Sequence, residues 1–342
     1  MKNILVSLLI IFIFTDITQG QKLSTRYIME IKKSIGNSRV IGFGEEEHYY
    51  RESNTNRIEI IKRLIKDGLI NSIVFEIPGT DAFVVNEYIH NRIDKPTLLT
   101  SLKQFKTRNG GPFFDSQEIF SFIEWLKNRN QKSNDIEVYG MDFYNYITAI
   151  QNLTQIEKYN ELLNNLDKIK QTLDTLTDYL HNNPSQLISK ETKKISSENL
   201  FMVKELLSKI DTFLSASGKC SAKDLYNYSY WFTDINNRDS IMFQNFTNYD
   251  NGKKKHLIWA ANFHIQNDSL AMPNFTSNLF GRLMTKKYKE QYFKIGVIST
   301  NPCGQDNSKR VFSPVASCNY KNKLDLIILI LKGNKTTSIF DK

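Results

Sequence analysis

The sequence contains little cysteine, and this scarcity excludes two classes of protein. Three cysteines in 342 residues are too few for a disulfide scaffold or for a zinc cluster built on thiolates. In an exported chain, Cys303 and Cys318 could close one loop and leave Cys220 free, and the sequence leaves this pairing open.

Two familiar hydrolytic motifs are also missing. The chain contains neither a Gly-x-Ser-x-Gly nucleophile elbow nor a His-Glu-x-x-His zinc motif. Chemistry that depends on a serine at such an elbow, or on zinc held by such a helix, is therefore not indicated.

Long apolar runs are almost absent. The one pronounced run, Ile4 to Phe14, is too short to cross about 30 Å of hydrocarbon as a helix that rises about 1.5 Å per residue. A lysine precedes this run and Thr-Gln-Gly follows it, which predicts a cleaved signal peptide over residues 1–20 and a mature domain over residues 21–342. We expect the mature protein to be secreted or periplasmic, without stable membrane insertion.

The chain carries excess positive charge without a concentrated basic motif. The net charge is +9 and the isoelectric point is near 9.2, but the lysines are dispersed and no basic segment is interleaved with aromatic residues. We therefore expect a small-molecule partner and no nucleic acid. The oligomeric state is not readable from the sequence.

Short β-branched runs alternate with amphipathic segments, which predicts an α/β fold with a mostly parallel sheet flanked by helices. Hydrophobic residues make up 40% of the chain and charged residues 24%, a balance typical of a packed core. The expected strands are residues 39–43, 72–77, 135–140, 256–261, 293–298 and 324–331. The expected helices are residues 23–35, a segment that starts after an N-cap at Ser53 or Asn54 and ends near Gly68, and residues 81–91, 116–127 and 279–286.

The middle of the chain has a different pattern. Residues 144–248 contain no strand run, and their apolar residues recur at helical spacing. We predict a large helical insertion here, packed as hairpins with turns at residues 182–184 and 215–219, which could form a lid or a wall.

Polar side chains follow four of the expected strands. Glu45 and His48 follow the first, and the ends of the next three carry Glu76, Asp142, and Asn262 with His264. Because the carboxyl ends of parallel strands lie at one edge of a sheet, we expect these groups to meet. Each also has an ordinary structural interpretation: Glu76 could cap a helix, Asp142 could pair with a lysine, and His264 could be exposed.

Several short motifs occur in order along the chain. They are Gly44-Glu45-x-x-His48, Arg51-Glu52, Arg57, the strand ending in Glu76, Gly140-x-Asp142, Arg238-Asp239-x-x-Met242-x-x-Asn245 and Trp259-Ala260-x-Asn262-x-His264. This ordered set covers nearly all of the expected mature chain and resembles the erythromycin esterase family.

The resemblance implies hydrolysis of an ester or lactone bond, such as that of a macrolide antibiotic, without a serine nucleophile. It implies that His48 is the general base that activates water, that Glu45 and Glu76 orient groups around it, and that Arg57 and His264 hold the substrate or the developing oxyanion. These roles suit the chemistry, since a neutral imidazole titrates near the pH at which a general base works best. Four further residues of the motifs are expected to contact the substrate: Arg51, Asp142, Arg238 and Asn262. No cofactor is implied.

The sequence departs from the family pattern at two places. The last motif commonly reads Trp-Ala-His-Asn-x-His, but Ala261 stands where the first histidine is expected, and Tyr49-Tyr50 replaces smaller residues. We therefore expect a natural substrate other than erythromycin. Only the family resemblance implies a link to macrolide resistance.

A second hypothesis uses the same residues differently. The wider group with this kind of sheet resembles haem-binding uptake proteins and metal-dependent peptidases, and Glu45, His48, Glu76 and His264 are all possible metal ligands. A ligand set of carboxylates and imidazoles without cysteine would suit Mn, Fe or Zn. Bound metal in stoichiometric amount favours this hypothesis, and turnover without metal favours the hydrolase.

Overall fold

The computed structural model of the chain describes most of the sequence. The described residues are 9–13, 25–45, 51–109, 116–133, 135–144, 146–154, 160–182, 190–210, 214–234, 237–267, 279–299 and 324–330.

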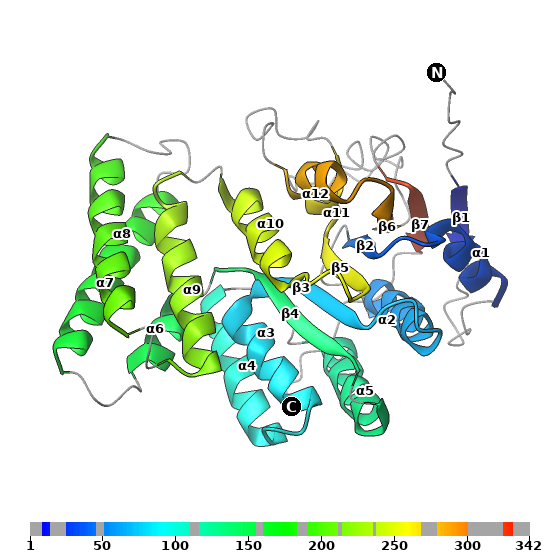
Figure 1. Ribbon diagram of the computed structural model, residues 1–342, viewed down its shortest axis with the longest axis horizontal. Coiled ribbons are helices and arrows are strands. Elements are labelled where there is room, and N and C mark those ends of the chain that lie inside the picture. Colours follow the sequence, from blue (N-terminus) through cyan, green and yellow to red (C-terminus); the bar gives the residue numbers. More distant parts are fainter. Residues whose placement is uncertain are drawn as a thin grey trace.

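Seven parallel strands form the central sheet, in the order β1-β7-β6-β2-β5-β3-β4 (Figure 1). They are β1 (Leu9–Ile13), β2 (Val40–Glu45), β3 (Ser72–Pro78), β4 (Glu137–Asp142), β5 (His256–Ala261), β6 (Tyr292–Ser299) and β7 (Leu326–Ile330). All pairings between them are parallel. The predicted α/β architecture is confirmed.

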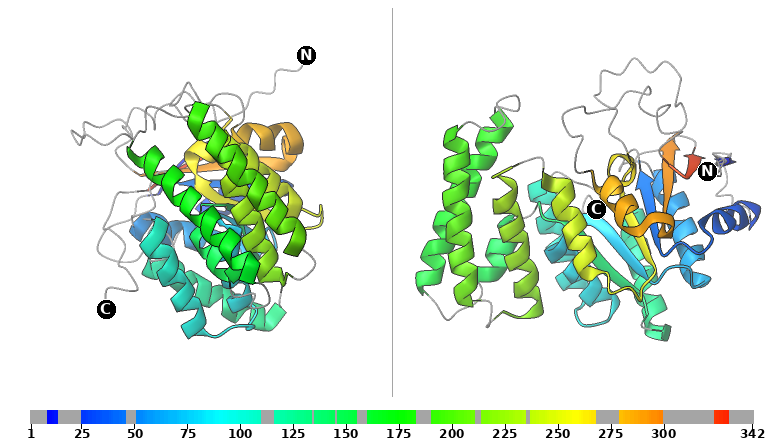
Figure 2. Two further views of the ribbon diagram at one scale, coloured as in Figure 1. Left: turned by 90° about the vertical axis from the view of Figure 1, so that its left-hand side faces the viewer. Right: turned by 45° about the horizontal axis from the view of Figure 1, so that its top comes forward.

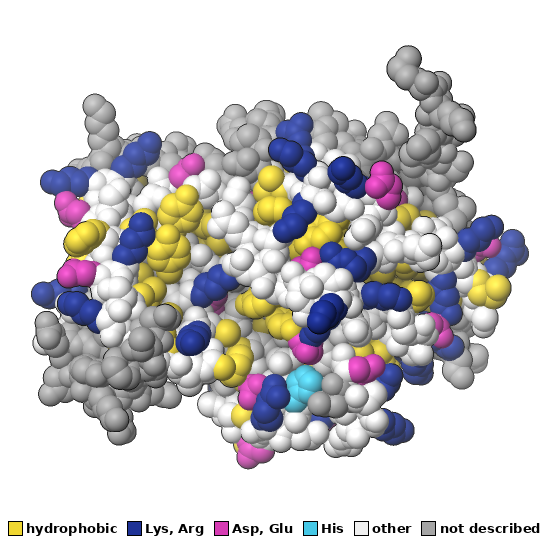
Figure 3. Space-filling view, in the orientation of Figure 1, with side chains coloured by type: hydrophobic (Ala, Val, Ile, Leu, Met, Phe, Trp, Pro, Cys, Tyr) yellow, Lys and Arg dark blue, Asp and Glu magenta, His cyan; other side chains and the backbone are white. Residues whose placement is uncertain are grey.

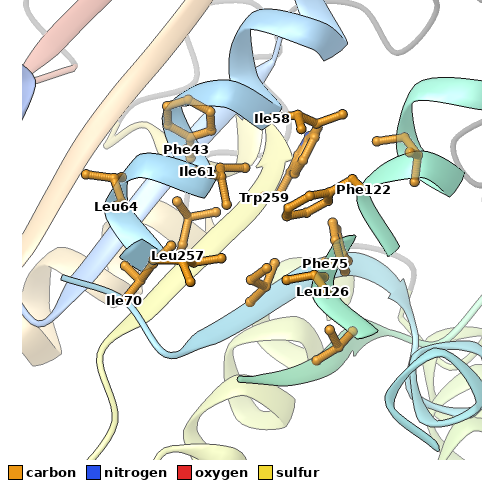
Figure 4. Close-up of a cluster of buried hydrophobic side chains, with 14 of the residues drawn as sticks. Phe43, Ile58, Ile61, Leu64, Ile70, Phe75, Phe122, Leu126, Leu257 and Trp259 are labelled. Atoms are coloured by element: carbon orange, nitrogen blue, oxygen red, sulfur yellow. The ribbon is translucent and has the colours of Figure 1, made fainter. Parts of the chain in front are cut away.

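One face of the sheet is covered by the helices of the first part of the chain. These are α1 (Thr25–Ile35), α2 (Arg51–Lys66), α3 (Gly79–Ile89), α4 (Lys95–Asn109) and α5 (Gln117–Ser133). Their apolar residues recur every three or four positions and face one core, in which Phe43, Phe75 and Trp259 of the sheet meet Phe122 of α5 (Figure 4). Two of these rings, Phe75 and Trp259, lie 5.6 Å apart between centroids.

The opposite face is covered by helices from the last part of the chain. They are α10 (Arg238–Tyr249), α11 (Asn262–Ile265), α12 (Phe280–Tyr288) and the short 3-10 helix η4 (Lys289–Gln291). Met242, Phe246 and Met284 of these helices pack on Val74 and Ile258 of the sheet. The sheet is therefore buried on both faces, as expected for an all-parallel sheet.

Four helices form a separate lobe beside the β4 edge of the sheet (Figure 2). They are α6 (Tyr146–Thr154), α7 (Asn160–Asn182), α8 (Lys190–Ile210) and α9 (Ala216–Trp231). The lobe has its own apolar core, built from residues such as Leu166, Leu173 and Val203. The segment predicted as a helical insertion thus consists of this lobe together with α10, and α10 packs on the sheet.

Three local expectations differ from the structure. α2 begins at Arg51, ahead of the expected caps Ser53 and Asn54. Ser215 does not open a turn but caps α9, because its hydroxyl accepts a hydrogen bond of 3.2 Å from the Gly218 N–H. The helix α4 was not expected; Asp94 caps it by accepting a hydrogen bond of 2.9 Å from the Thr97 N–H.

The expected signal peptide overlaps the first strand of the sheet. β1 pairs with β7 over its full length, from Leu9 with Leu326 to Ile13 with Ile330. Cleavage near Gly20 stays a prediction. Among the described residues, no helix combines the length and the apolar character that crossing a membrane requires.

The surface charge is dispersed, as the sequence indicates. On the face shown in Figure 3, lysine and arginine side chains are scattered among acidic and apolar ones and do not gather into one patch.

Candidate active site

The carboxyl edge of the sheet brings together polar residues that are far apart in the sequence. Strands β2, β5, β3 and β4 are neighbours in this order. Glu45 at the end of β2 is in register with Ala261 at the end of β5, and Pro78 at the end of β3 is in register with Asp142 at the end of β4. Glu76 lies close to the end of β3, so four of the expected residues, Glu45, Glu76, Asp142 and Asn262, lie at or next to the ends of these strands.

Arg238 lies at the centre of this edge. It is the first residue of α10, and its Nη2 lies 2.9 Å from Glu76 Oε1 and 2.6 Å from Asp142 Oδ2. Its Nη1 lies 3.2 Å from His264 Nε2. The guanidinium also packs over the ring of Tyr144, with its carbon 4.7 Å from the ring centroid. One cation therefore joins residues from two strands and two helices.

His264 is held between two carboxylates. Its Nε2 lies 3.2 Å from Glu76 Oε1 and its Nδ1 lies 2.9 Å from Asp239 Oδ1. The other oxygen of Asp239 accepts a hydrogen bond of 2.8 Å from the Phe280 N–H. The second oxygen of Glu76 accepts one of 2.8 Å from the Ala261 N–H. Both carboxylates are thus fixed at both oxygens.

The contacts decide the charge states of this group. Burial disfavours protonated His264, but Glu76 and Asp239 outweigh it and raise the pKa of His264 to about 10. Burial likewise disfavours ionised Glu76, yet His264 and Arg238 hold the pKa of Glu76 well below its ordinary value. At neutral pH His264 is an imidazolium, so it can stabilise negative charge but cannot accept a proton.

Glu45 belongs to a second, buried ion pair. It accepts a hydrogen bond of 2.9 Å from Trp259 Nε1 and pairs directly with Arg57 Nη1. Arg57 also donates to Asn54 Oδ1 at 2.5 Å, and its guanidinium lies 4.8 Å from the Trp259 ring. Arg57 is 0% exposed, and burial lowers its pKa to about 9. In this conformation Arg57 positions Glu45 and has no surface for a substrate.

Asn262 is also buried, with 1% of its surface exposed. Its side-chain amide donates a hydrogen bond of 2.9 Å to the Val297 carbonyl, which ties the end of β5 to β6. Its Oδ1 lies directly against Gly44, where a Cβ atom would clash with it. Asn262 therefore supports the turn that carries His264, and its direct contact with substrate stays a prediction.

Two expected site residues lie at or beyond the limits of the described structure. His48 falls in residues 46–50, which are not described, and the side chain of Arg51 is not described although its backbone opens α2. In the sequence, His48 is the third residue after Glu45, which ends β2.

Of the four candidate metal ligands, His48 lies outside the described residues, and Glu45 takes part in a different ion pair from Glu76 and His264. Among the described residues, no group of three or more His, Cys, Asp or Glu side chains could hold a metal ion. Glu76 and His264 face Arg238, and Glu45 faces Arg57. Both nitrogens of His264 are engaged, so a metal at this point would have to displace an arginine and a proton.

A serine, a histidine and an aspartate do line up at the opposite edge of the sheet. Ser72 Oγ lies 2.9 Å from His256 Nδ1, and His256 Nε2 lies 3.2 Å from Asp250 Oδ1. Both Ser72 and His256 are 0% exposed, and Asp250 is already paired with Arg39 at 2.6 Å. This arrangement joins the starts of β3 and β5 and is closed to a substrate.

Sequence reasoning missed two contributors to the site. Asp239 lies within a recognised motif but was given no role, and Tyr144 follows Asp142 in the sequence without any motif. Asp239 could have been found from its place beside Arg238, since an acid next to a site cation is a natural partner for an imidazole. The packing of Tyr144 depends on α10, and no local signal predicts it.

Comparison with known proteins gives a family match. A family model described as Erythromycin esterase matches residues 70–302, a range that includes Glu76, Asp142, Arg238 and His264. Glu45 and His48 precede the matched range.

Two relatives are similar to the chain at low sequence identity. The putative hydrolase YbfO of Bacillus subtilis (strain 168) is 18% identical over 342 residues, which cover 86% of this chain and 72% of the relative. Erythromycin esterase type II of Escherichia coli is 24% identical over 113 residues, which cover 33% of this chain and 25% of that protein.

Three solved structures share the fold. A mutant of the erythromycin esterase EreC in its open conformation has a TM-score of 0.58 at 16% identity, over 82% of this chain and 75% of that one. A protein from Bacillus cereus gives 0.61 at 15% identity, over 92% and 94%. A succinoglycan biosynthesis protein gives 0.58 at 18% identity, over 80% and 69%.

Proposed function

Because the chain belongs to the erythromycin esterase family, we propose that it hydrolyses an ester or lactone bond of a small molecule with water activated by His48. The observation that carries this proposal is the charge network at the carboxyl edge, where Arg238 and protonated His264 are held by Glu76, Asp142 and Asp239. The network holds two cations among three carboxyl groups, and Arg238 is the more exposed of the two cations.

In the proposed reaction, His48 removes a proton from water while the water oxygen attacks the ester carbonyl carbon. The carbonyl oxygen becomes an oxyanion, which the positive charge of Arg238 and His264 stabilises. The oxyanion then collapses, the C–O bond of the alcohol breaks, and the alkoxide takes the proton from His48. Preorganised donors of this kind contribute about 3 kcal/mol each in other hydrolases.

Arg238 is the cation best placed to meet the substrate. Its side chain is 26% exposed, against 7% for His264. In this proposal Arg238 contacts the carbonyl oxygen of the substrate. His264 holds Glu76 in place and adds its positive charge to the electrostatic field at the site.

Glu45 acts on His48 in this proposal. The buried pair with Arg57 and the hydrogen bond from Trp259 fix the Glu45 carboxylate three residues before His48. A carboxylate held beside an imidazole fixes its tautomer and stabilises the imidazolium formed during proton transfer.

The substrate we propose is an ester or lactone other than erythromycin. At the end of β5 the site presents the backbone N–H of Ala261 to Glu76 and no imidazole at this position. In the sequence, Tyr49 and Tyr50 directly follow His48 at positions where the family commonly has smaller residues. We also propose that the protein is exported, on the strength of the apolar N-terminal run.

The test is hydrolysis of a panel of macrolides and simple lactones, with and without EDTA. We expect turnover that survives EDTA and falls by about 100-fold or more in His48→Ala, the usual range for loss of a general base. His90→Ala is the matched control: His90 follows α3, about 16 Å along the helix from the carboxyl edge, and its loss should leave turnover unchanged.

Two results would contradict the proposal. Equal turnover by His48→Ala would remove the water-activating histidine. Turnover abolished by EDTA, together with stoichiometric metal in the purified protein, would favour the metal-dependent hypothesis.

A further inference from the structure

The helix that follows Glu76 is capped by a residue of the helical lobe. α3 starts directly after β3, and Pro78 at its N-cap position provides no side-chain hydrogen bond. Asp224 of α9 takes this role: its Oδ2 accepts hydrogen bonds of 2.7 Å from the Thr80 N–H and 2.6 Å from the Thr80 hydroxyl. It also accepts one from the Gly79 N–H. A carboxylate at a helix N-terminus satisfies otherwise unpaired donors.

On its other side, the end of β3 packs closely against β4. Gly140 packs against the carbonyl oxygens of Ile77 and Pro78 so closely that any Cβ atom at this position would clash with them. Glu76 lies immediately before these two residues. Its position therefore depends on Gly140 on one side and on the capped start of α3 on the other.

We propose that Asp224 is a positioning residue, which sets Glu76 from the helical lobe and through Glu76 aligns Arg238 and His264. The inference rests on the proposed hydrolase function and adds a residue to it. Figure 1 shows how α9 reaches the start of α3 from the lobe. The lobe thus contributes to the site a contact that spans 144 residues of sequence.

The buried surroundings of Asp224 disfavour its ionised form. Asp224 is 2% exposed, and burial, opposed by the hydrogen bonds from Thr80 and Gly79, raises its pKa to about 7. The charged or titratable groups that face it are Asp142 of β4, Tyr249 of α10, and Cys220 and Lys223 of α9. Since the folded pKa of about 7 lies above the ordinary value of 3.8, the contribution of Asp224 to stability falls as pH rises from about 3.8 through about 7 and is constant above that range.

Because of this stability penalty, a variant of Asp224 can lose its positioning role without losing stability, so turnover and melting temperature distinguish a positioning role from a purely structural one. A neutral isostere removes the penalty, so Asp224→Asn should keep its melting temperature at pH 8. It also places an amide N–H against the backbone donors of α3, so the start of the helix should shift. A shift of this kind at a site can reduce turnover by as much as about 100-fold.

The experiment compares the wild-type protein with Asp224→Asn, Thr80→Val and the control Asp178→Asn, which changes an exposed aspartate of α7 in the same lobe. We expect kcat for the ester substrate to fall about tenfold or more in Asp224→Asn with KM changed less than about threefold. Thr80→Val, which removes one donor and leaves α9 intact, should show a smaller loss. Amide exchange of residues 72–89 should rise in both variants and stay unchanged in the control.

The outcomes separate the two proposals. If the wild-type protein hydrolyses no ester in the panel, the proposed function fails, and the positioning role fails with it even if exchange at residues 72–89 rises. If the wild-type protein is active and folded Asp224→Asn retains kcat within about twofold, the positioning role alone is overturned. If Asp224→Asn does not fold, Thr80→Val decides, and unchanged kcat in that variant overturns the proposal.

Discussion

Protonation of the His264 imidazole is coupled to folding. The pKa of His264 in the folded protein, about 10, lies above the ordinary histidine value of 6.5. The stability that it contributes is therefore fully present below about pH 6.5 and is lost as pH rises through about 10. The difference corresponds to a few kcal/mol, so a change of this size should be measurable by denaturation.

We accordingly expect the melting temperature of the wild-type protein to fall between pH 7 and pH 10. In His264→Gln this slope should be reduced, because the neutral amide cannot lose a proton. His256→Gln is the matched control: burial lowers the pKa of His256, so it is neutral over this range and its loss should move the curve without changing the slope. Equal slopes in wild type and His264→Gln would show that the imidazolium is not held as described.

The Glu45–Arg57 pair gives a second prediction for single residues. Arg57→Met would leave Glu45 buried at 2% exposure without its cation, which costs about 3–5 kcal/mol for pairs of this kind. The double variant Glu45→Gln/Arg57→Met should recover part of that loss, because no uncompensated charge remains. Urea denaturation of the two single variants and the double variant measures the coupling, and strictly additive losses would contradict it.

The same double variant should not recover hydrolysis. Glu45 is proposed to act on His48, and glutamine carries no charge with which to stabilise an imidazolium. If the double variant regains stability but not hydrolysis, the Glu45–Arg57 pair contributes to the reaction as well as to the stability of the core.

At the scale of elements, the junction between β3 and α3 leaves no room for a side chain at Gly140. Gly140→Ala would place a methyl group against the carbonyl oxygens of Ile77 and Pro78. Backbone atoms cannot move aside as a flexible side chain can, so we expect a loss of about 1–3 kcal/mol and a lower kcat as Glu76 moves. Thermal denaturation and steady-state kinetics measure the two effects.

Gly218→Ala in α9 provides the comparison. A Cβ atom there would meet the Leu214 side chain at 3.1 Å, and this side chain can adjust. Alanine also favours a helix over glycine by about 1 kcal/mol, so this variant should be as stable as the wild type or slightly more so. A similar loss in both variants would mean that the close packing at Gly140 is not special.

Elements with a clear period could be predicted from the sequence, and contacts between distant elements could not. The strands at Ser72, His256 and Tyr292 are short β-branched or apolar runs, and all were expected. The cap of α4 at Asp94 was overlooked although its sequence is an ordinary N-cap signal. In contrast, Asp224 lies in a segment with only a helical pattern, and nothing local to it indicates that it caps a helix 144 residues earlier.

The candidate site shows the same division. Because parallel strands share a carboxyl edge, Glu76, Asp142 and His264 could be brought together from sequence order alone. Their individual roles could not, since Arg238 at the centre and the burial of Arg57 depend on how α10 and α2 pack on the sheet.

At the scale of the whole molecule, the buried apolar residues form three clusters, one on each face of the sheet and one mainly in the lobe. The sheet with its flanking helices and the lobe are therefore two parts with separate cores. A site that takes residues from the sheet and a capping residue from the lobe responds to the relative position of these two bodies. The junction at Thr80 and Asp224 is where a change in that position would first reach Glu76.

The edge strand β1 lies within the predicted signal peptide. Residues 9–13 pair with β7, whose sequence Leu-Ile-Ile-Leu-Ile is wholly apolar. Cleavage near Gly20, which stays a prediction, would remove this pairing and leave β7 as an edge strand able to pair with another chain. The predicted mature form would therefore carry an aggregation-prone edge that β1 covers in the full-length chain.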